Sequence, residues 1–247
     1  MDVLYVIGNG SKHGNLELRM SLRSISKYAD NLRNVVVVGS PPDWLSPEVK
    51  TLAIRDKYGC KHSNILACIE AAIDAGLVHG DFLYSSDDHF YIRKCDFDNY
   101  PYYHKADALR DRVLPGDKFC AYHTSIVETR KLLEKHHLPI KNYSQHCNTH
   151  MHTEVFKDIR DIVHESYKLS HGAEPTCLIM NAWMARPNHP TAVHRNDLKI
   201  RVAASMKELW RQIGNSECFS IGDSLFRNGS LRQLFATEYG VKCRFEK

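Results

Sequence analysis

Long apolar runs and paired cysteines are both absent from this sequence of 247 residues. No stretch of about 18 apolar residues occurs, which argues against a membrane-spanning helix. The eight cysteines form no C-x-x-C pair, so neither a zinc ribbon nor a disulfide framework is indicated. The first residues form an apolar segment without a basic stretch, which is not typical of a signal peptide. We therefore expect a cytoplasmic protein with reduced thiols.

Two common nucleotide-binding motifs, G-x-G-x-x-G and the P-loop, are also missing. The first apolar segment ends instead in Gly8, Asn9, Gly10 and Ser11, with no Gly-Lys-Ser/Thr after them. Glycine has no Cβ, so such a loop allows a ribose or diphosphate to approach the backbone closely. An ordinary turn is the alternative interpretation.

Composition and charge are those of an ordinary globular protein. Apolar residues make up 43% of the chain and charged residues 25%, enough to bury a full core. The net charge of +4 is compatible with an anionic substrate but is too small to indicate a nucleic-acid surface. Internal repeats and low-complexity segments are absent.

Apolar and amphipathic segments alternate in the first hundred residues. We expect strands over 2–7, 35–38, 51–54 and 81–85, and helices over 15–29 and 63–75. This β-α-β-β-α-β order predicts an α/β fold with a mostly parallel central sheet. Beyond residue 96 the pattern becomes irregular, with expected helices near 126–137, 153–169 and 200–213. We expect one domain over 1–247, in which a nucleotide-binding α/β core (1–95) precedes a helical half (96–247) that shapes the acceptor side.

Two adjacent carboxylates, Asp87 and Asp88, follow the apolar segment 81–85, and His89 comes next. The segment predicts a buried strand that brings both acids to the carboxyl edge of the sheet, where open α/β sheets bind ligands. Adjacent aspartates repel each other unless a cation or water lies between them. Mg²⁺ and Mn²⁺ bind carboxylates together with substrate phosphates, so we expect a metal-held diphosphate here. A solvated turn or a helix N-cap is the alternative.

Other polar side chains are expected near the same edge. Arg19 and Arg23 lie four residues apart on one helix, and a guanidinium can bind a phosphate or a carboxylate through two hydrogen bonds. Solvent exposure is their alternative. Asn64 stands where a helix begins, so N-capping competes with ligand binding. The residues expected on this rim are His13, Lys61, His62 and Asn64.

Histidines and a late acid are the candidates for a catalytic base. His146, His150 and His152 alternate in an extended segment, where they face one side and suit a metal ligand or a base. Ordinary surface or core positions are their alternative. Near the carboxyl end, an apolar strand over 219–221 ends in Gly-Asp-Ser, where Asp223 is either a second acid of the site or a turn residue. His146 is the first candidate to accept a proton from an acceptor hydroxyl, and Asp223 is the second.

Several segments, taken in order, resemble Stealth-type sugar-phosphate transferases and, more closely, short phage-encoded glycosyltransferases. Both groups carry the pattern seen here at 17–25 (E-L-R-M-S-L-R-S-I), and an asparagine-led helix before a strand that ends in paired aspartates. The phage-type proteins also share the segments found here at 101–104 and 143–146, and the tail from residue 220. Stealth proteins generally have V-D-G-S where this chain has G-N-G-S, and H-x-P where it has H-C-N. These departures weaken the phosphotransferase interpretation more than the glycosyltransferase one.

The resemblance implies a single glycosyltransferase-A-like (Rossmann-like) domain that binds Mn²⁺ or Mg²⁺ against the diphosphate of a nucleotide sugar. Asp88 is then the main metal ligand, Asp87 contacts the ribose or a metal-bound water, and His89 is a further candidate ligand. The residues expected at the donor are Gly8, Asn9, Gly10, Ser11, Arg19, Arg23, Asn64 and Asp87.

The sequence does not identify the acceptor molecule. A hydroxymethylated base in bacteriophage DNA, a surface glycan and a protein are the candidates, and a phage enzyme would act in the host cytoplasm. Tyr100, Tyr102 and Tyr103 would suit a flipped base, with core packing as the alternative. The rival functions are a Stealth-like sugar-1-phosphate transferase and a non-catalytic module that binds sugar or nucleic acid.

Overall fold

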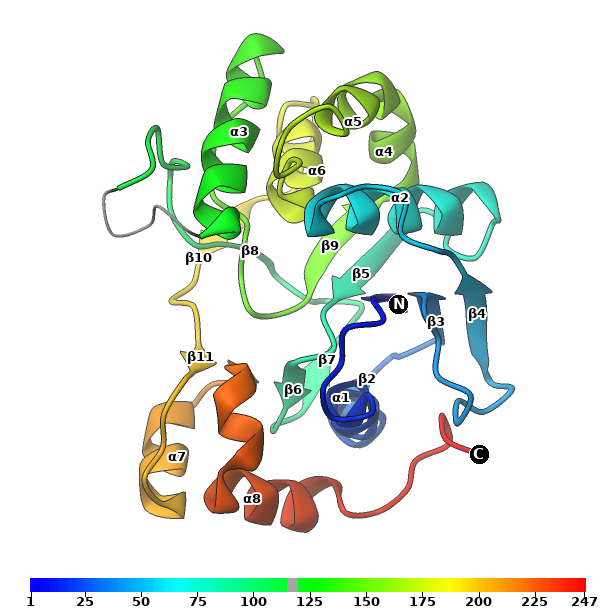
Figure 1. Cartoon of the computed structure of the whole chain (residues 1–247), viewed down its shortest axis with the longest axis vertical. Coiled ribbons are helices and arrows are strands. Elements are labelled where there is room, and N and C mark those ends of the chain that lie inside the picture. The colour runs from blue at the N-terminus through cyan, green and yellow to red at the C-terminus, as the bar shows by residue number, and fades with distance from the viewer. Residues whose placement is uncertain (115–119) are drawn as a thin grey trace.

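A computed structural model describes residues 1–114 and 120–247, apart from the side chain of Asp223. Its centre is a five-stranded sheet in the order β4-β3-β1-β5-β9 (Figure 1). The strands are β1 (Asp2–Ile7), β3 (Asn34–Gly39), β4 (Val49–Ala53), β5 (Asp81–Ser85) and β9 (Thr149–His152). All neighbours in this sheet are parallel except β9, which runs antiparallel to β5. The expected α/β fold with a mostly parallel central sheet is confirmed.

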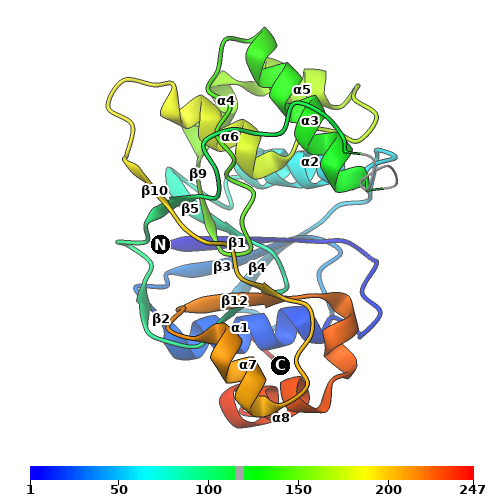
Figure 2. The ribbon, with the colours of Figure 1, turned by 90° about the vertical axis from the view of Figure 1, so that its left-hand side faces the viewer.

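Helices cover both faces of the sheet (Figure 2). One face carries α2 (Lys61–Asp74), α3 (Ala121–Lys135), α4 (Thr153–Asp158), α5 (Arg160–Ser166) and α6 (Pro175–Met184). The other face carries α1 (Leu16–Tyr28), α7 (Met206–Ile213) and α8 (Gly229–Tyr239). Among the described residues, no helix is both long enough and apolar enough to cross a membrane.

The valine run in β3 shows why this sheet is buried on both sides. Val35 and Val37 pack with α1, while Val36 and Val38 point to the other face and pack with α2. All four side chains are fully buried. Burying one such side chain contributes about 1.5–3 kcal/mol, so the run fixes β3 inside the layered structure.

Smaller sheets connect the second half of the chain to the first. A three-stranded sheet has the order β11-β12-β6, with β6 (His89–Tyr91), β11 (Lys199–Ile200) and β12 (Cys218–Ile221). Two strand pairs join β2 (Ala29–Asp30) to β7 (Cys95–Asp96), and β8 (Tyr102–His104) to β10 (Ala192–His194). A 3₁₀ helix (Asp223–Arg227) follows β12. Since β12 runs antiparallel to β6, late residues lie directly beside the turn that contains Asp87 and Asp88.

Several sequence expectations for the second half need correction. The helix expected over 153–169 is two helices, α4 and α5, which meet at Ile159. The helix expected over 200–213 begins only at Met206, because Ser205 accepts a hydrogen bond from the Glu208 amide and caps it there. Helices α6 and α8 were not expected; α6 is apolar on most sides and nearly all buried, so it shows no helical periodicity. All eight cysteines are free, as expected.

The order of strands changes direction at β1. The chain moves from β1 to β3 and β4 on one side, and then places β5 on the other side of β1. Tyr5 in β1 pairs with Ser85 in β5, so the loops that follow these two strands are neighbours. Ligands of open α/β sheets bind at such a reversal, outside the carboxyl ends of the strands.

Candidate functional site

A cavity of about 610 Å³, called here the large cavity, opens at this reversal. Its walls come from the loops after β1 and β5, the segment before α2, and parts of the β11-β12 region. Residues expected at the site that line it are Gly8, Asn9, Gly10, Ser11, His13, Lys61, Asn64, Asp87 and Asp88. Lys199 and Phe226, from the second half of the chain, line it as well. The structure therefore brings most of the expected rim together.

The glycines of the loop after β1 leave space in the large cavity. A Cβ added at Gly8 or Gly10 would meet no protein atom within 4 Å, and neither glycine has a positive φ. Packing and backbone strain therefore do not explain these glycines, whereas close approach of a ligand would. Ser11 closes the loop: its hydroxyl donates to Glu17 at 3.0 Å and accepts from the amides of His13 and Asn15.

The turn after β5 holds its two acids in different surroundings. Burial and the neighbouring charge of Asp88 raise the pKa of Asp87 to about 6. Asp88 Oδ2 accepts from Ser220 Oγ at 2.7 Å and from Lys199 Nζ at 3.2 Å. Burial would raise the pKa of Asp88, but the charges of His89 and Lys199 and the bond from Ser220 lower it instead. Asp88 is thus an ionised carboxylate that already has a cationic partner.

The expected metal ligands make contacts within the chain. The His89 side chain is 4% exposed, and its Nδ1 accepts from the Ser86 amide at 3.4 Å. Its Nε2 lies 3.9 Å from Asp88 Oδ1. Among the residues that the structure describes, no three His, Cys, Asp or Glu side chains are placed to hold a metal ion.

The Lys199 ammonium also disfavours a divalent ion on the same carboxylate. Because Lys199 pairs with Asp88 and the His89 side chain is buried, the set of Asp87, Asp88 and His89 fits Mn²⁺ or Mg²⁺ poorly.

Arg19 and Arg23 point away from the large cavity, toward the last residues of the chain. Arg23 binds both oxygens of the Glu246 carboxylate, at 2.6 and 2.8 Å, and donates to the Tyr239 carbonyl. Arg19 lies 3.4 Å from the same carboxylate and covers the ring of Trp44. The expectation that these guanidinium groups bind the nucleotide is corrected, because a buried carboxylate already binds them.

Asn64 shapes the wall of the large cavity. Its Oδ1 accepts from the amides of Lys57 and Tyr58, and its Nδ2 donates to the Tyr58 carbonyl at 2.9 Å. It is the fourth residue of α2, so it is not the N-cap. Its side chain therefore fixes the loop before α2, and direct nucleotide binding by Asn64 is not what the geometry indicates.

A second cavity of about 160 Å³, called here the small cavity, adjoins the large one. The residues common to both linings are Lys61, Ile65, Tyr84, Ser86, Asp88 and Lys199. The small cavity also contains His146 and the buried Glu174. The two cavities therefore meet at a pair of lysines and an aspartate.

His146 is held by a carboxylate that the sequence did not point to. Its Nδ1 lies 2.6 Å from Asp197 Oδ2, and its backbone amide donates to Asp197 Oδ1 at 2.8 Å. Lys105 Nζ also donates to Asp197 Oδ2 at 2.8 Å. Burial would raise the pKa of Asp197, but the bonds from His146 and Lys105 hold it well below its usual range.

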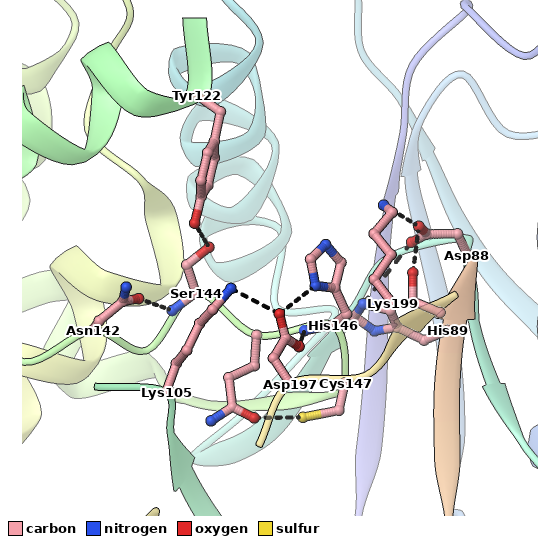
Figure 3. Close-up of polar contacts among 12 residues, drawn as sticks. Asp88, His89, Lys105, Tyr122, Asn142, Ser144, His146, Cys147, Asp197 and Lys199 are labelled. Carbon is pink, nitrogen blue, oxygen red and sulfur yellow. Dashed lines mark hydrogen bonds and ion pairs between the residues drawn. The ribbon is translucent and has the colours of Figure 1, made fainter. Parts of the chain in front are cut away.

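This arrangement suits a proton acceptor at His146. An ionised Asp197 makes Nδ1 the protonated nitrogen, which leaves Nε2 with a free lone pair. Figure 3 shows the imidazole between Asp197 and the pair formed by Lys199 and Asp88. Asp197 and Lys199 reach the site through the late segment around β11, where neither shows a local sequence signal.

Further candidate residues lie outside the two cavities or outside the described part of the structure. His150 is buried, with Nε2 on the Tyr100 carbonyl at 2.6 Å, and its ring stacks on Tyr102. The side chain of Asp223 lies outside the described part of the structure, and its backbone begins the 3₁₀ helix. Tyr100 and Tyr103 pack edge to face, and neither lines a cavity. For these tyrosines the structure shows packing.

Comparisons with known proteins give little further guidance. No family model and no curated protein matches the chain. Among solved structures, it is similar to a galactosyltransferase, LgtC, in complex with donor and acceptor sugar analogues. That similarity covers 97% of this chain and 95% of the other, at 10% identity and a TM-score of 0.48. At this level it carries no argument about function, and the relation to Stealth-type and phage-encoded proteins stays a prediction.

Proposed function

We propose that this chain is a glycosyltransferase-A-like enzyme that moves a sugar from a nucleotide-sugar donor to an acceptor hydroxyl. The observation that carries the proposal is the pair of adjoining cavities, which meet at Lys61, Asp88 and Lys199. One cavity lies where α/β sheets bind nucleotides, and the other presents a histidine with a carboxylate partner.

The large cavity is proposed as the donor site. Gly8 and Gly10 leave room for the diphosphate, and the amino-terminal end of α2 faces the cavity through Gly59, Cys60 and Lys61. The Cys60 side chain makes no capping hydrogen bond, so the first amides of α2 are not capped by it. Such a helix end carries partial positive charge, which suits a phosphate.

The small cavity is proposed as the acceptor site, with His146 as the base. The acceptor hydroxyl attacks C1 of the sugar while its proton passes to His146 Nε2. The bond from C1 to the diphosphate oxygen breaks, and both of its electrons leave with the nucleoside diphosphate. A base placed across from the leaving group is what a single displacement with inversion needs.

A glycan hydroxyl is the acceptor that we favour over a base in DNA. Tyr100, Tyr102 and Tyr103 were the residues expected to hold a flipped base, and none of them lines either cavity. The Tyr102 hydroxyl donates to Asp81 at 3.0 Å, which fixes that ring in the core. The small cavity instead places the Tyr122 and Ser144 hydroxyls and the Glu174 carboxylate near His146, and these groups suit a sugar.

The proposal is tested by incubating the protein with a panel of nucleotide sugars and methyl glycosides and following the products by ³¹P NMR. Release of a nucleoside diphosphate that is lost in His146→Ala supports the proposal. Release of a nucleoside monophosphate would instead identify a sugar-1-phosphate transferase. If the nucleotides bind without turnover in both proteins, a non-catalytic binding module is the better description.

A further inference from the structure

Two lysines lie at the junction of the two cavities. Lys61 and Lys199 line both cavities, so both ammonium groups lie where a diphosphate in one cavity would face an acceptor in the other. Lys199 is held in place by Asp88 at 3.2 Å (Figure 3). Asp88 in turn accepts a hydrogen bond from Ser220 at 2.7 Å. Only 21% of the Lys199 side chain is exposed, so its ammonium is more confined than a surface lysine.

Resting on the glycosyltransferase function proposed above, we propose that Lys199 and Lys61 supply the positive charge for the departing diphosphate, and that the donor binds without a divalent metal. Asp88 is then a positioning residue, because it acts by holding Lys199. The sequence predicts Asp88 as the main metal ligand, whereas here it holds the lysine that takes the place of the metal.

The charge placement supports a lysine in this role. When the bond to C1 breaks, both electrons go to the phosphate oxygen, and the negative charge of the diphosphate increases. Positive groups fixed beforehand stabilise such charge without having to reorganise during the reaction. The only proton transferred is the one that moves from the acceptor to His146.

The experiment measures binding of nucleoside diphosphates by isothermal titration, so it does not depend on activity. UDP, GDP, ADP, CDP and dTDP are titrated into the intact protein with EDTA, and again with Mn²⁺ or Mg²⁺ in place of EDTA. The variants are Lys199→Met, Lys61→Met and the charge-conserving Lys199→Arg. The control is Lys27→Met, because Lys27 is also ion-paired, with Glu238 at 2.8 Å, but lines neither cavity.

We expect one diphosphate to bind in EDTA with a Kd within about threefold of its value in Mn²⁺. Lys199→Met and Lys61→Met should each weaken binding in EDTA at least tenfold, about 1.4 kcal/mol, while Lys199→Arg and Lys27→Met stay within about threefold of wild type. Lys61 is exposed at the start of α2, so its variant tests the idea even if Lys199→Met does not fold.

Two results would overturn the inference and leave the proposed function standing. One is a Kd that is at least tenfold weaker in EDTA than in Mn²⁺ or Mg²⁺. The other is metal-free binding that both lysine variants retain at wild-type strength. If no nucleoside diphosphate binds under any condition, the proposed function itself fails.

Discussion

Removing the Glu246 carboxylate should destabilise the fold without changing nucleotide binding. Its side chain is 4% exposed and accepts two hydrogen bonds from the Arg23 guanidinium, with Arg19 3.4 Å away. The change Glu246→Ala leaves these two cations beside an apolar methyl group. Removing one partner of a buried ion pair typically costs about 3–5 kcal/mol, because the other charge stays desolvated.

This cost can be read from thermal unfolding. For chains of roughly 150–250 residues, 1 kcal/mol lowers Tm by about 2–4 °C, so we expect Glu246→Ala to lower it by roughly 6–20 °C. The control is Lys94→Ala, which removes an ion pair with Asp30 whose side chains are 67% and 54% exposed. Such a surface pair contributes about 1 kcal/mol or less, so its Tm should hardly change.

Nucleotide binding, measured well below Tm, distinguishes a structural role of the arginines from a role in binding the nucleotide. The structure assigns Arg23 to the carboxyl-terminal segment, so Glu246→Ala should bind nucleoside diphosphates as wild type does. The reasoning is refuted if Glu246→Ala unfolds at the wild-type Tm. It is also refuted if Arg23→Met, while still folded, loses nucleotide binding, since that result would return the arginine to the donor site.

Three further results are expected. Burial lowers the pKa of His89 from 6.5 to about 4. As the pH falls from 6.5 to 4, the unfolded chain therefore takes up a proton at this residue while the folded chain does not, and the free energy of unfolding decreases. At about 1.4 kcal/mol per pH unit this loss is roughly 3 kcal/mol, and His89→Gln should lack it in denaturant titrations at pH 7 and pH 4. Gly10→Val should weaken nucleotide binding at least tenfold by titration calorimetry at an unchanged Tm, because Gly10 lines the large cavity and a Cβ added there meets no protein atom within 4 Å. Asp197→Asn should slow release of the nucleoside diphosphate about 10²–10⁴-fold and change its pH profile, while the donor Kd stays the same, because His146 loses the partner that fixes its tautomer.

The donor side of the site could be predicted because its signals are local. The loop at 8–11 and the turn at 87–88 each follow an apolar strand directly, and the parallel sheet brings the ends of these strands together. A short apolar run followed by polar residues is visible in any window of the sequence. What these residues bind was harder to predict than where they lie.

The partners of these residues could not be predicted because they come from distant segments. Arg23 and Glu246 are 223 residues apart, and Asp88 and Lys199 are 111 apart. On the sequence alone, the arginines of α1 and the aspartates after β5 looked unpaired, so phosphate and metal were the natural partners to expect. Long-range pairing of β12 with β6 provides partners that no local pattern indicates.

The link from Asp88 to Ser220 also sets an order of events during synthesis. The two residues are 132 positions apart, so at about 5–20 residues per second the ribosome needs roughly 7–26 s between them. The strands β1, β3, β4 and β5 can pair in that time, before Lys199 is available to pair with Asp88. The first sheet therefore has time to form while the site is unfinished, and β12 and Lys199 complete the site when they arrive.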